Sequence, residues 1–222
     1  MVVSPSMTLM DEPRTPIAGL DLSLTGAGVA VLRPDGSLRT ERFGHALKKE
    51  ASERQRLERV ITITNAVMGC LREELVTHVG VENYAFSGHL LTLQAELAGN
   101  LKVQIFVGLK TVPLVIPSTS VRKFLLGKNT KDKAVVEKHL RFLGYNSPRS
   151  HDEFDALAVA KVIEAWAFGR SALIEEHQQD LMRRLDYQVS RPEGMIKNAG
   201  SEHGRAHGRS GKHARRQDRS DG

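Results

Sequence analysis

The sequence is poor in the residues and segments that mark several common protein classes. It has a single cysteine, Cys70, which excludes an internal disulfide framework and lies in a pattern that predicts a buried helical position. Its nine histidines show no zinc-ligand spacing. No apolar run approaches the roughly 18 residues of a transmembrane helix, and the first residues lack the regions of a signal peptide. We therefore expect a soluble, cytoplasmic protein.

Composition and charge suggest a polyanionic partner. The chain has 222 residues, 40% of them hydrophobic, which is enough for one sizeable core. Its formal net charge is +6 and its pI is about 9.6, which favours nucleic acid or an anionic membrane as a partner. Residues 191–222 carry eight Lys or Arg against four acids and have no apolar pattern that could form a core. This composition predicts a basic disordered tail.

Turn residues and apolar periodicity divide the rest of the chain. Residues 1–16 contain three prolines and no periodicity, which predicts a flexible N-terminal arm. Three short strands joined by turns follow, and helices then alternate with strands, which indicates an α/β architecture. The predicted strands are 17–22, 28–32, 37–43, 78–84 and 112–117, and the predicted helices are 50–75, 89–109, 119–126, 131–143, 152–168 and 172–187.

Four carboxylates stand where a carboxylate is awkward for folding. Asp21 interrupts an apolar strand, Glu82 ends another, and Asp152 and Asp155 open an apolar helix on one of its faces. An unpaired buried charge is costly, so such acids usually become neutral or find a partner. Two strand acids and a helix-borne pair are the oxygen ligands that a two-ion Mg²⁺ site for phosphodiester chemistry needs.

Each of these acids also has a simpler interpretation. Asp21 can start a turn, and Glu82 can face solvent at the end of its strand. The segment 150–153 has the sequence of a capping box, which explains the acids of the first helical turn but explains Asp155 less well. Whether Glu153 joins the metal ligands, caps the helix, or does both at different times stays open.

Basic and aromatic residues near the acids suggest a nucleic-acid surface. The segment 121–133 carries five basic residues against one acid, and as a cluster it predicts contacts with a DNA backbone, although each one alone is typical of a solvated helix. Tyr84 and Phe86 can stack on an exposed base or pack in the core. The candidate DNA-binding residues are Arg122, Lys123, Lys131, Lys133, Tyr84 and Phe86.

Three motifs together resemble the RuvC family of Holliday-junction resolvases. They are Gly-Leu-Asp-Leu-Ser-Leu-Thr at 19–25 with Gly-Val-Ala at 28–30, Val-Glu at 81–82, and Asp-x-x-Asp-Ala-Leu-Ala-Val-Ala at 152–160. The resemblance covers about residues 17–169 in family order. It implies an RNase H-like fold, with a mixed five-stranded sheet flanked by helices. It further implies a homodimer that cuts two opposed strands of a four-way junction in DNA recombination and repair.

The resemblance also implies roles for particular residues. The counterparts of Asp21, Glu82, Asp152 and Asp155 bind two catalytic Mg²⁺ ions, which Mn²⁺ can replace, and Lys133 is a fifth catalytic residue. Arg122 stands where the family has a lysine near the scissile phosphate. The short turn after Asp21 resembles bacteriophage-encoded relatives, which implies a role in the cytoplasm of a bacterial host and activity on other branched DNA.

We therefore expect a nuclease domain over 17–169 and a C-terminal helix within 170–190, before the basic tail. The expected activity is that of a crossover junction endodeoxyribonuclease, a Mg²⁺-dependent hydrolase. The stretch 89–109 is a candidate dimer helix or, equally, part of the core. The alternatives are an RNA-processing nuclease of the same fold and a non-catalytic DNA-binding protein that relies on its tail. A sugar-kinase-like ATPase would need a second large lobe.

Overall fold

The structure is a computed structural model, and it describes residues 14–23, 25–44, 51–83, 91–130, 132–169, 172–173 and 175–190, without the side chains of 91–93. Five strands form one mixed sheet in the order β3-β2-β1-β4-β5. The predicted α/β fold with a mixed five-stranded sheet flanked by helices is confirmed. The strands are β1 (Ile17–Asp21), β2 (Ala27–Leu32), β3 (Leu38–Phe43), β4 (His78–Asn83) and β5 (Leu114–Pro117).

The sheet combines a meander with parallel strands. β1 pairs antiparallel with β2, and β2 pairs antiparallel with β3, as the short predicted turns require. On its other side β1 pairs parallel with β4, and β4 pairs parallel with β5. Because β1, β4 and β5 run in the same direction, their carboxyl ends lie at one edge of the sheet.

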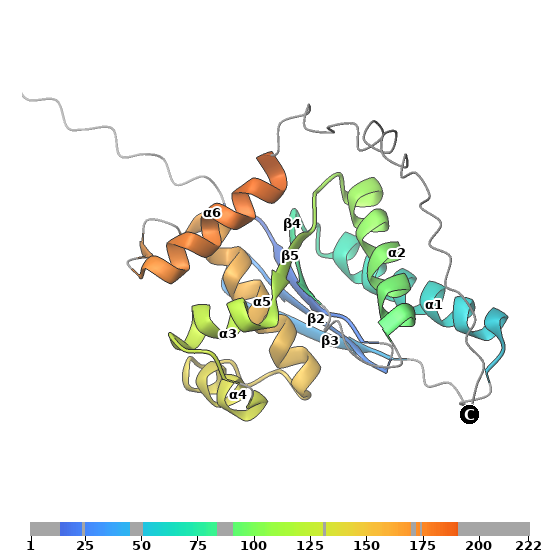
Figure 1. Cartoon of the computed structure of the whole chain (residues 1–222), viewed down its shortest axis with the longest axis horizontal. Coiled ribbons are helices and arrows are strands. Elements are labelled where there is room, and N and C mark those ends of the chain that lie inside the picture. The colour runs from blue at the N-terminus through green and yellow to red at the C-terminus, as the bar shows by residue number, and fades with distance from the viewer. Residues whose placement is uncertain are drawn as a thin grey trace, which may run out of the picture. The chain divides into compact units, whose positions relative to one another are not determined.

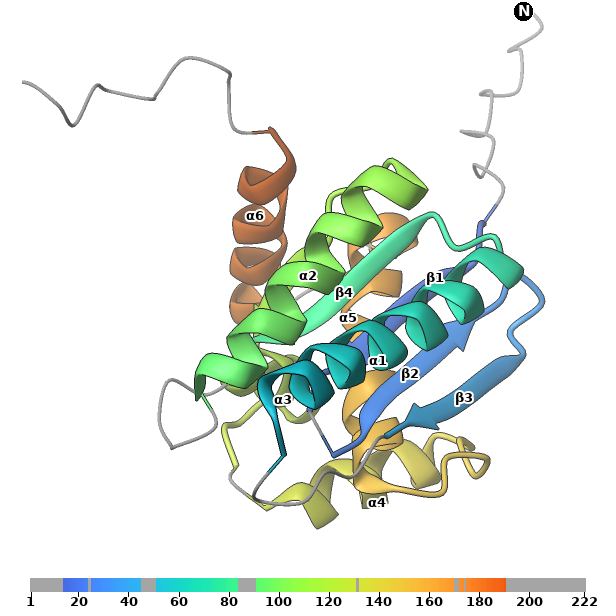
Figure 2. The ribbon, with the colours of Figure 1, turned by 90° about the vertical axis from the view of Figure 1, so that its right-hand side faces the viewer.

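In the described part of the chain, helices α1 to α6 cover the sheet on both faces (Figures 1 and 2). On one face, α1 and α2 pack over buried side chains of the central strands, and α3 to α6 pack over the other face. Alternation along β1 sends Ile17 to the second layer and Ala18 and Leu20 to the first. The helices are α1 (Glu53–Glu73), α2 (Leu91–Leu109), α3 (Ser118–Leu126), α4 (Lys133–Phe142), α5 (His151–Phe168) and α6 (Glu176–Ser190).

Several boundaries differ from the sequence prediction for local reasons. Helix α1 begins after Ser52, whose hydroxyl accepts a hydrogen bond from the backbone of Gln55 in a capping box. Helix α4 begins after Asp132, whose carboxylate accepts from the backbone N–H of Ala134. Strand β5 begins only at Leu114, since the proline before it has no N–H to donate to the sheet.

Helix α6 covers the open edge of the sheet at β5. The side-chain amide of Gln188 donates to the carbonyl of Val115 at 2.9 Å and accepts from its N–H at 2.8 Å. A side chain thereby satisfies backbone groups that an edge strand would otherwise expose. Helix α6 also reaches α3, because Gln178 donates to the carbonyl of Phe124 at 3.1 Å.

The predicted tail over 191–222 lies outside the described residues, as does most of the predicted N-terminal arm. Within the described part of the chain, none of the helices is long and apolar enough to cross a membrane.

Candidate metal centre

Two acids meet at the edge of the sheet where the parallel strands end. The register of β1 and β4 pairs Leu20 with Val81, and the next residue on each strand is Asp21 and Glu82 respectively. Both carboxylates are only partly exposed, beside a sheet whose strands are buried up to this point. Parallel pairing therefore places two acids, 61 residues apart in the sequence, side by side.

Helix α5 delivers a third acid because it lies unusually close to the sheet. A Cβ added at Gly19 would fall 2.1 Å from the carbonyl oxygen of Ala156, and one at Gly28 would fall 2.1 Å from that of Asp152. Only glycine lets the helix backbone approach β1 and β2 to this distance. The first turns of α5 consequently reach the strand ends, and Asp155 is buried there with 6% of its surface exposed.

The carboxylates of Asp21, Glu82 and Asp155 form a compact cluster, which we call the acidic triad. Each offers one oxygen, and these oxygens all lie within 4.8 Å of one another. Three oxygen ligands at this spacing suit a hard divalent cation such as Mg²⁺. Sequence reasoning expected the three residues to share a site, and the structure brings them together.

Burial and mutual repulsion perturb two members of the triad strongly. Burial, followed by the charge of Asp155, raises the pKa of Asp21 to about 7. Burial, followed by the charge of Asp21, raises the pKa of Glu82 to about 8. Crowded carboxylates of this kind are stabilised in their charged form by a cation. The chemistry of the triad therefore fits the metal that the sequence predicts.

Lys133 provides the triad with one positive charge. Its ammonium Nζ donates a hydrogen bond of 2.5 Å to Oδ2 of Asp155 from the first turn of α4. Burial lowers the pKa of Lys133, but the hydrogen bond and the attraction of the three carboxylates outweigh it and leave the pKa raised. The lysine side chain is about half exposed, so its charge can also reach a group outside the protein.

Asp152, the fourth predicted ligand, lies at a different position from the triad. Its Oδ2 accepts a hydrogen bond of 2.7 Å from Nε of Arg42 on β3, and Arg42 also donates to the carbonyl of Thr25 at 2.9 Å. A Cβ at Gly26 would fall 2.2 Å from this guanidinium group. Sequence reasoning missed Arg42, whose place in a polar edge strand is typical of a solvent-exposed residue.

Glu153 has a structural role at the start of α5. Its Oε2 accepts hydrogen bonds from the backbone N–H of Arg149 at 2.7 Å and from the hydroxyl of Thr40 at 3.2 Å. Its own backbone N–H donates to the hydroxyl of Ser150 at 3.3 Å. Of the three interpretations left open by the sequence, these contacts favour the cap.

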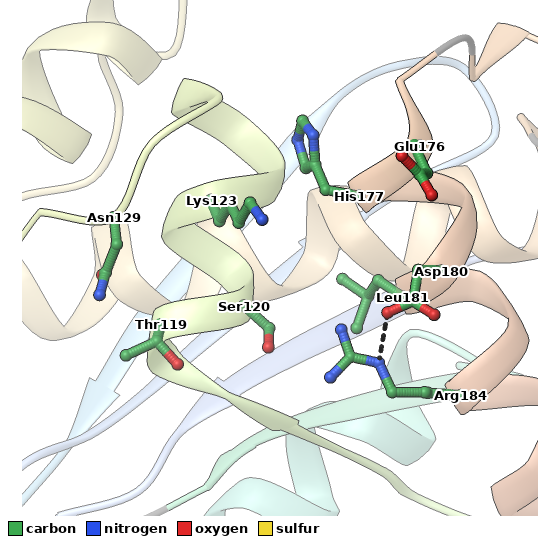
Figure 3. A pocket seen from close by; sticks show the side chains of 9 residues that line it. All are labelled: Thr119, Ser120, Lys123, Asn129, Glu176, His177, Asp180, Leu181 and Arg184. Carbon is green, nitrogen blue, oxygen red and sulfur yellow. Dashed lines mark ion pairs between the residues drawn. The ribbon is translucent and has the colours of Figure 1, made fainter.

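The predicted DNA-binding residues separate into two groups on the structure. Arg122 on α3 donates to the carbonyl of Thr130 at 3.1 Å, and its charge acts on Glu82, whose pKa it lowers in part. Lys123, the next residue, instead lines a cavity between α3 and α6 (Figure 3). Tyr84, Phe86 and Lys131 lie outside the described residues.

Comparisons with known proteins agree with this fold. No protein-family model and no curated protein sequence matches the chain. The structure of Thermus thermophilus RuvC in complex with a Holliday junction substrate matches with a TM-score of 0.52 and 22% identity, over 66% of this chain and 90% of that one. A further T. thermophilus RuvC structure matches with a TM-score of 0.50 and 24% identity, over 66% and 91% of the two chains. The chain has a RuvC-like fold.

Proposed function

We propose that the protein is a Mg²⁺-dependent, structure-specific DNA endonuclease that resolves Holliday junctions and other branched DNA. The single observation that carries this proposal is the acidic triad, which gathers three partly or fully buried carboxylates at one edge of a RuvC-like sheet. The T. thermophilus protein with the same fold has been solved with a Holliday junction substrate. A basic pI of about 9.6 supports a polyanionic substrate.

In the proposed mechanism, the triad holds the catalytic metal and Lys133 acts on the phosphate. A bound pair of Mg²⁺ ions would activate water and neutralise charge on the scissile phosphate. Asp21, Glu82 and Asp155 are the proposed ligands, already gathered by the two strands and α5. The half-exposed ammonium group of Lys133 orients Asp155 and can stabilise charge that develops on a phosphate oxygen.

Asp152 is the fourth proposed ligand, and Arg42 controls its availability. The guanidinium group holds Oδ2 of Asp152 at 2.7 Å, so this oxygen can join the metal ligands only if the ion pair exchanges. The pair is part-exposed on both sides, which makes such an exchange inexpensive. Arg42 would then be left beside the substrate as a cation.

Further parts of the proposal concern the domain limits and the partner subunit. We propose that the nuclease domain spans 17–169, that a C-terminal helix follows within 170–190, and that the protein is of the bacteriophage type. We also propose a homodimer. Among the described side chains of α2, Val103, Phe106 and Val107 are exposed, and exposed apolar residues gathered on one helix suit an interface.

A cleavage assay with matched variants tests the activity. We expect the wild type with Mg²⁺ to cut a synthetic four-way DNA junction in preference to a linear duplex, and Asp21→Asn and Glu82→Gln to lose at least about 100-fold in rate. Glu58→Gln, on the exposed surface of α1, is the control and should cut normally.

The same assay separates the alternatives. Undiminished cutting by Asp21→Asn would remove the mechanism, and cutting confined to structured RNA would favour an RNA-processing nuclease instead. A chain that lacks residues 191–222 should bind DNA less tightly but still cut it. Loss of all binding on this deletion would support a non-catalytic protein that depends on its tail.

A further inference from the structure

A cavity of about 370 Å³ lies between α3 and α6, apart from the acidic triad. Figure 3 shows side chains from both helices facing one another across it, with Lys123 reaching from α3 toward α6. Eight of its nine lining residues have polar or charged side chains, and carbon atoms form much of the rest of its surface. The residues that line it are Thr119, Ser120, Lys123, Asn129, Glu176, His177, Asp180, Leu181 and Arg184.

Polar groups of this cavity lack partners among the residues that the structure describes. The ring Nε2 of His177 is buried and makes no hydrogen bond. Lys123 forms no ion pair with a described residue. Helix α3 begins after a proline with no side-chain cap, which leaves its first backbone N–H groups without that partner. Lys123 is exposed, so a ligand in the cavity can reach its ammonium, and together with the first N–H groups of α3 it suits a ligand that accepts hydrogen bonds.

On the side formed by α3, the charges of the cavity favour an anion over a cation. Two acids contribute to its lining, but Asp180 is already paired with Arg184 at 3.2 Å and Arg183 at 3.6 Å. Glu176 is exposed at the first turn of α6, as Lys123 is on α3, and the two lie on different helices. The side of the cavity formed by α3 presents the ammonium of Lys123 and two hydroxyl groups, and no acid. A phosphate group, with several acceptor oxygens and a negative charge, has the matching chemistry.

The cavity adjoins the edge of the sheet that carries the triad. The register of β4 and β5 places Glu82 opposite Ile116, and α3 begins two residues later at Ser118. Helix α3 thus directs Arg122 toward Glu82 and the adjacent Lys123 into the cavity. A DNA strand carries a phosphate on every nucleotide, so a strand that crosses the triad presents further phosphates along α3.

We propose that the cavity between α3 and α6 binds a backbone phosphate of the DNA strand, separate from the phosphate that is cut. The inference rests on the proposed nuclease function and adds a second anchoring point to it. Lys123 supplies the charge, while the hydroxyl of Ser120 and the first backbone N–H groups of α3 supply hydrogen-bond donors. Such a contact fixes the position of the strand and carries no sequence information.

A scan with neutral phosphates tests this proposal. Single methylphosphonate groups are placed in turn along one strand of a four-way junction, and binding is measured by fluorescence anisotropy with Ca²⁺ in place of Mg²⁺. For the wild type, we expect one position near the cut, but distinct from it, to lose about 5-fold in affinity. Lys123→Ala should bind unmodified DNA about 5-fold more weakly, with a salt slope reduced by about 1, and should lose nothing further at that position.

Lys102→Ala is the matched control, because it removes one lysine from α2 on the opposite face of the sheet. It should retain the full position-specific loss of the wild type. Ser120→Ala, which removes a hydroxyl donor from the cavity, should reduce that loss at the same position. The inference is wrong if Lys123→Ala keeps the wild-type profile, or if Lys102→Ala erases the effect equally. Failure of the wild type to cut junctions would instead refute the proposed function itself.

Discussion

Asp21→Asn should make the metal-free protein more stable while it abolishes cleavage. Burial and the nearby carboxylates raise the pKa of Asp21 from 3.8 to about 7, so the folded protein binds a proton more tightly than the unfolded chain does. Between these two pH values, the folded state holds more protons at this residue, and the stability of the wild type therefore falls as the pH rises. Above about pH 7, Asp21 is charged in the folded protein, so the loss of folding stability that this buried charge causes is complete. The neutral side chain of Asp21→Asn removes this loss.

The expected gain in the free energy of unfolding follows from the difference between the pKa of Asp21 in the folded protein and in the unfolded chain. About 3 pH units correspond to about 4 kcal/mol at 1.36 kcal/mol per unit. Asp21 shares its repulsion with Glu82, and a buried amide still has to be desolvated, so we expect roughly half of this, about 2 kcal/mol at pH 8. At pH 4, where Asp21 is protonated in the folded wild type, the gain should shrink to a few tenths of a kcal/mol.

Urea denaturation at pH 4, 6 and 8 in EDTA measures these changes. Glu58→Gln serves as the control, since its exposed ion pair with Arg54 contributes about 0.5 kcal/mol at most. Added Mg²⁺ should stabilise the wild type and have much less effect on Asp21→Asn, because the ion binds the folded triad. A variant that is less stable than the wild type at pH 8 in EDTA would refute the electrostatic reasoning.

Three further predictions concern packing, ion pairing and assembly. Gly19→Ala should cost about 3 kcal/mol or more in urea denaturation by forcing α5 off the sheet, whereas Gly69→Ala, in the interior of α1 with open space around its Cβ, should raise stability by up to about 1 kcal/mol. Arg42→Ala should lower the half-saturating Mg²⁺ concentration about 3- to 10-fold in calorimetry by freeing Asp152, and an unchanged value would contradict this. Phe106→Glu should convert a dimer into a monomer in sedimentation, and a wild type that is already monomeric would dismiss the dimer.

The sequence predicted the fold well because its strongest patterns are local. Alternating or continuous apolar runs bounded by turn residues located all five strands, and the short turns indicated the meander of β1 to β3. The strand acids were visible for the same reason, since a carboxylate in an apolar run breaks the pattern. Boundaries moved where a single cap or proline decided them, as at Asp132.

The arrangement of the site was harder to predict because it depends on tertiary contacts. Helix α5 is buried on nearly all sides, so its apolar pattern does not show which face meets the sheet. Gly19 and Gly28 mark the close approach, but a glycine in a strand does not reveal which element will lie against it. Likewise, Lys123 and Lys133 belong to one basic segment of the sequence. Only the fold shows that Lys133 contacts the triad while Lys123 lines the cavity.

The two ion pairs at the acids differ in a way that bears on how the site would work. Lys133 binds a member of the triad from the start of α4, and its raised pKa keeps it charged beside the other two carboxylates. Arg42 binds Asp152 from an edge strand, where the pair is more exposed and its exchange costs less. Three acids are therefore fixed by the sheet and by α5, whereas the fourth is adjustable. With this arrangement, Asp152 would become a metal ligand only when metal and DNA bind, whereas folding alone places the other three acids.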